Sequence, residues 1–200
     1  MGRPLAPLIS IDGLVTASLD LVDETGDFSL PKLARRIGVS QSSIYNHVSG
    51  REEILELMRR RIISEVPYPA LQGLNWEDTL RVVIRAYRDA FARHPRLAPL
   101  MVLQTVQDVK VIGLYEDLAL ALEDAGFQGK DVVSAITTID SFALGAALDL
   151  AAPEVVWAPA GEGFPALTRA LEHAGPPRQR GEDAFDFGLE VIIAGLRARL

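Results

Sequence analysis

Apolar residues recur at three- and four-residue spacing along nearly the whole chain, and this helical period constrains the fold more than any other feature. Val15, Leu19 and Val22 follow this spacing, so residues 11–24 are predicted to form an amphipathic helix. No segment of the sequence shows the alternation of apolar and polar residues that indicates a half-buried strand. The 200 residues therefore predict an all-α fold with a substantial core.

Capping residues divide the N-terminal part into a series of predicted helices. Gly26 is expected to end the first helix, because glycine adopts the left-handed conformation common at helix C-termini. Ser29 is expected to cap a second helix, and Ser40 a third helix over residues 41–47. Gly38 supplies the conformational freedom for a tight turn between the second and the third.

Ser49 and Glu52 have the spacing of a capping box, in which the serine satisfies free amides and the glutamate reaches back to the cap. They open a predicted fourth helix. A break that contains two prolines and a glycine follows this helix and is the best domain boundary. The sequence thus predicts two domains, residues 1–65 and residues 66–200.

The second predicted domain carries further helical patterns. Asn75 is expected to cap the first of these helices and Pro95 to end it. The apolar segment 130–152 is predicted as one helix, and residues 182–200 as the last. Residues 153–181 hold five prolines among several glycines, so we expect mostly loop there, with one short helix.

The charges are distributed unevenly along the chain. The net charge of −7 by itself argues against a nucleic-acid partner. From Phe28 to Arg51, however, there are four basic residues and no Asp or Glu, whereas from Val66 onward there are 12 basic and 18 acidic residues. The N-terminal part therefore has the local basic character that DNA phosphates require.

Cysteine is absent from the sequence, which excludes disulfides and thiolate metal sites. The N-terminal residues lack the apolar run of a signal peptide. No stretch approaches the ~20 apolar residues that cross a bilayer. We therefore expect a cytoplasmic protein without a membrane partner.

Residues 29–48 have the spacing of a helix-turn-helix. Ala34 is small where two helices cross closely, Gly38 occupies the turn, and Ile44 is the apolar anchor of the second helix. Such geometry presents that helix to a DNA major groove. With Ile44 and Val48 facing inward, the polar residues left on or near the surface are Gln41, Ser42, Ser43, Tyr45, Asn46 and His47. The alternative is a solvated helical hairpin with no DNA partner.

The segment from Leu33 to Val48, with Arg51-Glu52-Glu53-Ile54-Leu55 after it, closely resembles the DNA-binding domain of the tetracycline repressor family. The resemblance implies a helix-turn-helix domain of three or four helices followed by a helical domain for dimerisation and effector binding. The DNA-binding residues predicted on this basis are Gln41, Ser42, Ser43, Tyr45, Asn46, His47, Arg51 and Lys32.

The resemblance also implies a role for each group of these residues. Gln41 and its two neighbours contact bases or nearby phosphates, Tyr45 and His47 grip the backbone, and Arg51 pins a phosphate. The sequence departs from the family's pattern in an N-terminal arm whose only basic residue is Arg3.

A homodimer is predicted from the second domain. Residues 132–152 carry only two charges, Asp140 and Asp149, and a helix that is apolar nearly all round must bury more than one face. We expect one face to pack within the subunit and another against a partner. The last helix is expected to share this contact, because Gly188 and Gly195 permit close approach. The alternative is that both are core helices of a monomer.

Isolated polar residues on otherwise apolar helices predict one cavity per subunit for a mostly apolar small-molecule effector. The residues assigned to this cavity are Tyr87, Gln104, Gln107, Tyr115 and Thr137. His94 lies at a predicted helix end, where the helix dipole favours it. With three histidines in the chain a metal-ligand set is incomplete, so no metal or cofactor is expected.

These features predict a transcriptional regulator, a repressor that a small-molecule effector releases from double-stranded operator DNA, and not an enzyme. Two alternatives stay open. One is an α-helical enzyme that uses Asp108, Asp140 or His94 as acid–base groups, although the sequence holds no nucleophile elbow, phosphate loop or HExxH pattern. The other is a helix-turn-helix used only for protein contacts, which would assemble without binding DNA.

Overall fold

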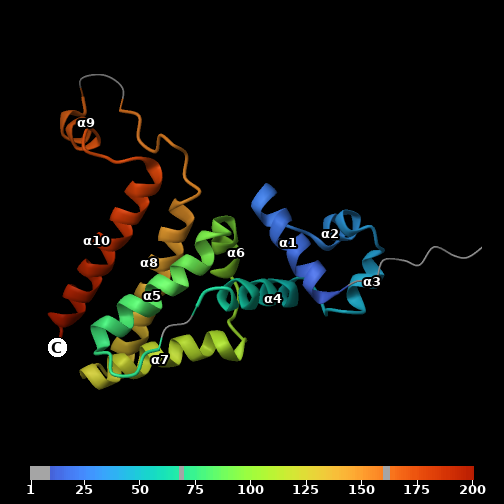
Figure 1. Ribbon diagram of the computed structural model, residues 1–200, viewed down its shortest axis with the longest axis horizontal. Helices are drawn as coiled ribbons and strands as arrows, with labels where there is room; N and C mark the ends of the chain where they lie inside the picture. Colours follow the sequence, from blue (N-terminus) through green and yellow to red (C-terminus); the bar gives the residue numbers. More distant parts are fainter. Residues whose placement is uncertain (1–9, 68–69, 160–162) are drawn as a thin grey trace, which may run out of the picture.

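Figure 1 shows the computed structural model, which describes residues 10–67, 70–159 and 163–200. Every regular element in these ranges is a helix, which confirms the predicted all-α fold. The elements are α1 (Ile11–Thr25), α2 (Leu30–Ile37), α3 (Gln41–Tyr45), α4 (Arg51–Ser64), α5 (Trp76–Ala92), the 3-10 helix η1 (Pro95–Leu97), α6 (Ala98–Met101), α7 (Val109–Ala125), α8 (Lys130–Asp149), α9 (Pro165–Leu171) and α10 (Pro177–Arg197). Arg3, the basic residue of the N-terminal arm, lies outside the described residues.

Local capping sets many of the helix boundaries as predicted. Ser29, Ser40 and Asn75 each accept a side-chain hydrogen bond from the amide three residues on, at 3.4, 3.1 and 2.9 Å. Gly26 and Gly38 end α1 and α2 with φ values of 79° and 72°. Because side chains disfavour this left-handed conformation, glycine is the residue that fits both positions.

The capping box predicted from Ser49 and Glu52 at the start of α4 is wrong. The N-cap residue is Gly50, and no described side chain caps the helix. Glu53, not Glu52, reaches back: its Oε2 accepts hydrogen bonds from the Ser49 amide at 2.6 Å and the Ser49 hydroxyl at 2.8 Å. These bonds stabilise the carboxylate and so lower the pKa of Glu53.

The ends of the C-terminal helices also differ from the prediction. Helix α10 begins at Pro177 rather than at residue 182. Proline has no amide hydrogen, but the amides of the first helical turn make no bond within the helix, so proline fits there. Helix α8 ends at Asp149, and residues 150–152 leave the helix. The expected short helix is α9, in which no residue is buried. Figure 1 shows α9 on a long connection that stands away from the other helices.

Two hydrophobic clusters hold the helices together. The first joins α1–α4 to Phe91 of α5, Leu97 of η1, Met101 of α6 and Leu144 of α8. The second joins α5, α7, α8 and α10. The first cluster crosses the boundary proposed between residues 65 and 66, so the N-terminal helices and the C-terminal helices are packed against each other.

Helix α8 is long and apolar, and it lies within the C-terminal group of helices. By length and composition alone its 20 residues are able to span a membrane, contrary to the expectation from the sequence. The packing explains this composition, because α8 lies against α5, α7 and α10. Only 33% of the apolar window is buried within one chain, so a large part of the helix remains for a second subunit to cover.

Candidate nucleic-acid interface and effector pocket

The helix-turn-helix forms as its spacing predicts. Ile44 is fully buried between α2 and α3, with Ala34 and Val48 buried beside it. The turn at Gly38 is closed by a hydrogen bond of 3.0 Å from the Val39 amide to the Ala34 carbonyl oxygen. This packing fixes the angle between the two helices and leaves one side of α3 open.

Polar side chains of α3 and of the turn after it occupy that open side. Helix α3 ends at Tyr45, earlier than the predicted 47, and the next two residues form a turn. The exposed members of the predicted DNA-binding set are Gln41, Ser42, Tyr45, Asn46, His47 and Lys32, whereas Ser43 and Arg51 are partly buried. No described residue hydrogen-bonds to the side chains of Gln41, Asn46 or His47, so their donors and acceptors are available to a partner.

Three serine hydroxyls form a small cluster at the start of α3. Ser40 Oγ lies 2.8 Å from Ser42 Oγ and 2.7 Å from Ser43 Oγ while it caps the helix. A hydroxyl has one donor and two acceptor positions, so each keeps hydrogen-bonding capacity beyond the cluster. The cluster orders two predicted DNA contacts before any partner arrives.

Arg51 is engaged within the chain. Its Nη2 donates to Asp27 Oδ1 at 2.7 Å, its Nε donates to the Phe28 carbonyl oxygen at 3.3 Å, and its guanidinium lies 5.0 Å from the centre of the Phe28 ring. The hydrogen bond from Arg51 lowers the pKa of Asp27. Arg51 therefore fixes the connection between α1 and α2, an internal role that the sequence did not reveal.

The cations that remain free lie on the outer side of α2. Arg36 is paired with Glu24 through two hydrogen bonds of 2.7 and 2.6 Å. Lys32 and Arg35 are exposed and have no side-chain partner among the described residues. Their three-residue spacing places them on one face of the helix. Arg35 is absent from the predicted DNA-binding set, although its spacing from Lys32 was a usable signal.

A chain of three polar side chains lies between α5, α7 and α8. The hydroxyls of Tyr87 and Tyr115 lie 3.3 Å apart, and Tyr115 donates to Asp140 Oδ1 at 2.8 Å. Burial raises the pKa of Tyr87 well above its usual value, and the neighbouring Tyr115 and Asp140 raise it further. Burial and Asp140 also raise the pKa of Tyr115. Both phenols therefore stay protonated and serve as hydrogen-bond donors.

These three side chains line a cavity that is otherwise apolar, with a volume of about 20 Å³. This is room for about one water molecule, whereas ligand pockets have roughly 300–1,000 Å³. The helices are thus closely packed where the sequence predicts the effector cavity. A cavity of this size has no room for a drug-sized ligand while α5, α7 and α8 keep these positions.

The other predicted effector residues lie elsewhere. Gln104 and Gln107 line a separate recess of about 590 Å³ beside α4. Thr137 is exposed, and its hydroxyl donates to the Val133 carbonyl oxygen at 2.8 Å. Asp140 of α8 is the third member of the tyrosine group and accepts the hydrogen bond from Tyr115. It shares the buried face of α8, and this helical phase was the signal that could have found it.

Helix α4 is bonded to the segment between α6 and α7. Glu56 Oε1 accepts hydrogen bonds from the amides of Gln107 and Asp108, at 2.9 and 2.7 Å. Arg60 pairs with Asp108, the N-cap residue of α7. The guanidinium of Arg59, which is 2% exposed, donates to the last carbonyl of α6 at 3.3 Å. These bonds tie α4 to the end of α6 and to the start of α7.

His94 lies apart from the tyrosine cluster and joins α5 to the DNA-binding helices. Its Nδ1 lies 2.7 Å from Asp23 Oδ2 of α1. Arg96 donates to the carbonyl oxygens of Asp23 and Glu24 at 2.7 and 2.9 Å, at the C-terminal end of α1. In the parts of the chain that the structure describes, no group of three His, Cys, Asp or Glu side chains is placed to hold a metal ion.

Comparisons with known proteins agree with this architecture. Residues 68–200 match the tetracyclin repressor-like C-terminal domain. The tetracycline repressor protein class D of Escherichia coli is 30% identical over 94% of this chain and 89% of its own length. The TetR family protein ActR of Streptomyces coelicolor, solved in complex with (S)-DNPA, is similar with a TM-score of 0.73, 22% identity and coverage of 96% and 98%. BioQ, solved with its double-stranded DNA operator, has a TM-score of 0.68, 23% identity and coverage of 95% and 99%.

The fold and the exposed α3 therefore define a helix-turn-helix transcriptional regulator. Within this class, the chain belongs to the tetracycline repressor family.

Proposed function

We propose that two copies of this chain bind a palindromic operator, each through α3, and that a small-molecule effector releases the repressor from this DNA. The observation that carries the proposal is the surface formed by α3 and the turn after it: the unpaired side chains of Gln41, Asn46 and His47 are exposed there, while Ile44 is buried on the opposite side of α3. Side chains of this kind read base edges in the major groove. BioQ, a structural relative, binds its operator as double-stranded DNA.

Different residues of the N-terminal helices have different roles in this proposal. Gln41 contacts base edges, because its amide offers both a donor and an acceptor. Lys32 and Arg35 contact phosphates and contribute salt-dependent affinity. Arg51 holds Asp27 and Phe28 in place, so it supports the position of α2 in addition to any phosphate contact.

The dimer contact is proposed for α8 and α10. Their exposed apolar side chains include Val133 (64% exposed), Phe187 (74%) and Val191 (54%). Gly145 of α8 has open space where a side chain would begin, which permits close approach of a partner helix. By contrast, Gly188 is already in contact within the chain, because a Cβ there would lie 2.5 Å from Phe142.

The effector is proposed to enter between α5, α7 and α8 and to hydrogen-bond to Tyr87, Tyr115 or Asp140. ActR, another structural relative, binds a small molecule, (S)-DNPA. Opening these helices displaces the α6–α7 segment, to which Glu56 and Arg60 of α4 are bonded. The displacement changes the separation of the two α3 helices in the dimer. A coupling of roughly 1–3 kcal/mol would change operator affinity by 5–150-fold.

Two further features follow from this proposal. A regulator that binds operator DNA works where the chromosome is, so we place the protein in the cytoplasm. The division of labour is residues 1–65 for DNA binding and residues 66–200 for dimerisation and effector binding, without a catalytic role. Two relatives of the chain are named as an HTH-type transcriptional regulator and as a tetracycline repressor protein, which supports a role without catalysis.

The test is selection of DNA bound by the purified protein from a random pool, followed by a screen for compounds that release the selected sequence. The proposal predicts a palindromic or near-palindromic sequence and at least one releasing compound. No enriched sequence at low salt would overturn the DNA-binding part. An enriched sequence that no compound releases, with binding unchanged in Tyr115→Phe, would leave a constitutive repressor instead.

A further inference from the structure

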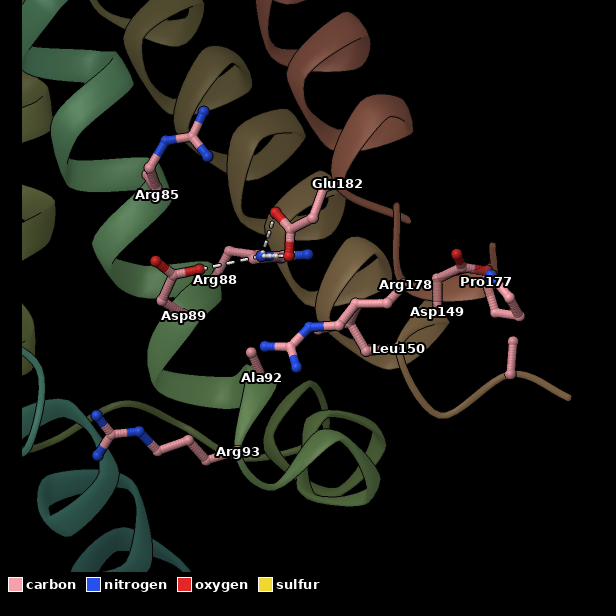
Figure 2. Close-up of a pocket in the computed structure, with 11 residues that line it drawn as sticks. Arg85, Arg88, Asp89, Ala92, Arg93, Asp149, Leu150, Pro177, Arg178 and Glu182 are labelled. Carbon is pink, nitrogen blue, oxygen red and sulfur yellow. Dashed lines mark hydrogen bonds and ion pairs between the residues drawn. The ribbon is translucent and has the colours of Figure 1, made fainter. Parts of the chain in front are cut away.

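A second cavity, of about 640 Å³, lies between the C-terminal half of α5, the end of α8 and the start of α10 (Figure 2). It shares no lining residue with the cavity at Tyr87 and Tyr115. Its volume is within the roughly 300–1,000 Å³ of ligand pockets. The charged residues that line it are Arg85, Arg88, Arg93, Arg178, Asp89, Asp149 and Glu182.

Arg88 is the unusual residue of this cavity. It is 2% exposed, and only its Nη1 is bonded, to Glu182 at 2.9 and 3.0 Å and to Asp89 at 3.1 Å. Figure 2 shows this side chain reaching from α5 toward Glu182 of α10. The Nε and Nη2 atoms are buried and have no acceptor among the described residues. Buried donors without an acceptor are rare in folded proteins and call for an explanation.

The two unpaired atoms lie on the same edge of the guanidinium. This edge presents two parallel N–H groups, which is the arrangement that binds a carboxylate through two hydrogen bonds. The orientation of the group is already fixed, because the guanidinium lies 5.0 Å from the centre of the Phe185 ring. Phe142 in turn stacks on Phe185, with ring centres 5.5 Å apart.

Arg178 is a second cation of the cavity with hydrogen-bond donors that are not in use. It is exposed and has no partner among the described residues, whereas Arg85 is paired with Asp186 and Arg93 with Glu65. Arg178 also lies in the first turn of α10, whose positive dipole end favours an anion. The four arginines and the three carboxylates of Asp89, Asp149 and Glu182 give the lining of the cavity a net charge of +1. It suits a single negative charge better than the two charges of a phosphate.

We propose that this cavity binds a small molecule with one carboxylate group, held by the Nε–Nη2 edge of Arg88 and by Arg178. Both Arg88 atoms are covered in this conformation, so the carboxylate reaches them as the side chains above the cavity move apart. Arg178 is exposed and unpaired, and is therefore free to turn toward the bound carboxylate. This site is independent of the effector cavity between α5, α7 and α8.

Isothermal titration calorimetry of the full-length protein with three probes tests the proposal: benzoate, neutral benzamide and doubly charged phenyl phosphate, all at one ionic strength. Benzoate is expected to bind saturably, one per chain, and at least roughly tenfold more tightly than either other probe, as charge-assisted hydrogen bonds imply. Arg178→Ala should weaken benzoate binding about tenfold. Arg169→Ala, which removes an exposed and unpaired arginine of α9, should leave it unchanged.

Arg88 requires a balanced variant, because its removal alone leaves Glu182 without a partner. The double variant Arg88→Gln/Glu182→Gln should lose benzoate binding and keep a single cooperative thermal transition. If this variant does not fold, the Nε–H signal of Arg88 in NMR spectra of the unmodified protein decides. That signal should shift as benzoate is added.

Three results would overturn the proposal. They are no saturable heat with benzoate, equal binding of all three probes, or an Arg88 Nε–H signal that does not move. A loss of benzoate binding in Tyr115→Phe but not in Arg178→Ala would also overturn it, since benzoate would then occupy the effector cavity.

Discussion

The α3 surface and the Tyr87–Tyr115–Asp140 cluster are both groups of polar side chains, but they are built in opposite ways. The α3 surface comes from one continuous segment and is positioned by the Ser40 cap and the turn at Gly38. The cluster joins residues 28 and 25 positions apart on three different helices. The first is open to a partner as it stands, whereas the second is closed. The proposed DNA-binding surface is thus preformed, and the proposed sensing region has to change shape.

The contrast has an energetic basis. A preformed surface loses little side-chain freedom on binding, so its contacts contribute to affinity directly. A closed cavity of about 20 Å³ requires work to open, and a ligand meets this cost only if it binds the open form more tightly. This difference is what allows an effector to act as a switch.

The largest effect is expected when the two chains of the proposed dimer are separated, because one α3 surface then has to bind DNA alone. Gly145→Glu places a charge in open space on α8, so one chain should fold normally while the two chains of the proposed dimer separate. Operator affinity should fall by at least about 1,000-fold, toward non-specific binding. Analytical ultracentrifugation and fluorescence anisotropy measure the two quantities.

The matched control for this variant is Leu120→Glu, which adds the same charge at an exposed apolar residue of α7. It should leave both the dimer and DNA affinity unchanged. A Gly145→Glu protein that stays dimeric would place the dimer interface on other helices.

The next effect distinguishes a contact to bases, proposed for Gln41 of α3, from a contact to phosphates, proposed for Arg35 of α2. Gln41→Ala should reduce affinity for the selected operator by about 1–3 kcal/mol and relax preference at one position of each half-site. Arg35→Ala should weaken binding to all DNA sequences by a similar factor. It should also reduce the slope of log affinity against log salt concentration by about 1 for each phosphate contact that is lost. Binding titrations at several salt concentrations, with operator and scrambled DNA, distinguish the two. Equal losses on both DNAs for Gln41→Ala would show that this side chain reads no base.

A smaller effect is expected in the sensing region. Tyr115→Phe removes the hydroxyl that links Tyr87 to Asp140 and leaves the ring in place. The concentration of effector that releases half of the DNA should rise about tenfold, as the loss of one buried hydrogen bond implies. DNA affinity without effector should change little. Leu120→Ala, at an exposed apolar residue of α7, serves as a comparison, and an equal response of both variants to the effector would exclude the cluster from the sensor.

The smallest effect concerns the start of α4, which connects the two regions. Glu53→Ala should lower the free energy of unfolding by about 0.5–1 kcal/mol, because the Ser49 amide loses its acceptor. Glu52→Ala should have almost no effect. The pKa of Glu53 is lowered in the folded state, so its contribution is complete above the ordinary value of 4.5 and is lost as the pH falls through the lowered pKa. Urea unfolding at pH 7 and at a series of pH values below 4.5 measures this, and the difference between the variants should shrink as the pH falls.

The sequence predicted best those features that depend on neighbouring residues. The caps at Ser29, Ser40 and Asn75, and the helix ends at Gly26 and Gly38, involve atoms only a few positions apart, and the structure has them all. The start of α10 was missed because a proline-rich segment is typical of a loop, yet proline also fits the first turn of a helix.

The features that the sequence could not place depend on tertiary packing. Gln104, Gln107 and Thr137 have the polarity of ligand-binding residues, but the first two lie in the segment between α6 and α7 and line a recess beside α4, and Thr137 lies on the exposed side of α8. Arg51 has the expected type and place for binding a phosphate, but the sequence does not reveal that Asp27 comes within 2.7 Å of it. Interactions between distant segments follow from helix packing, which residue spacing alone does not fix.

The central claim is that two α3 helices, held at a fixed separation by a dimer, read the two halves of one operator. Paired recognition helices enter successive major grooves about 34–36 Å apart. The most direct test is the affinity of the protein for its selected operator before and after insertion of five base pairs between the half-sites, which turns one half-site by about half a helical turn. The affinity for the lengthened site is expected to fall to that for non-specific DNA. Unchanged affinity would show that the two α3 helices do not read the two half-sites at a fixed separation.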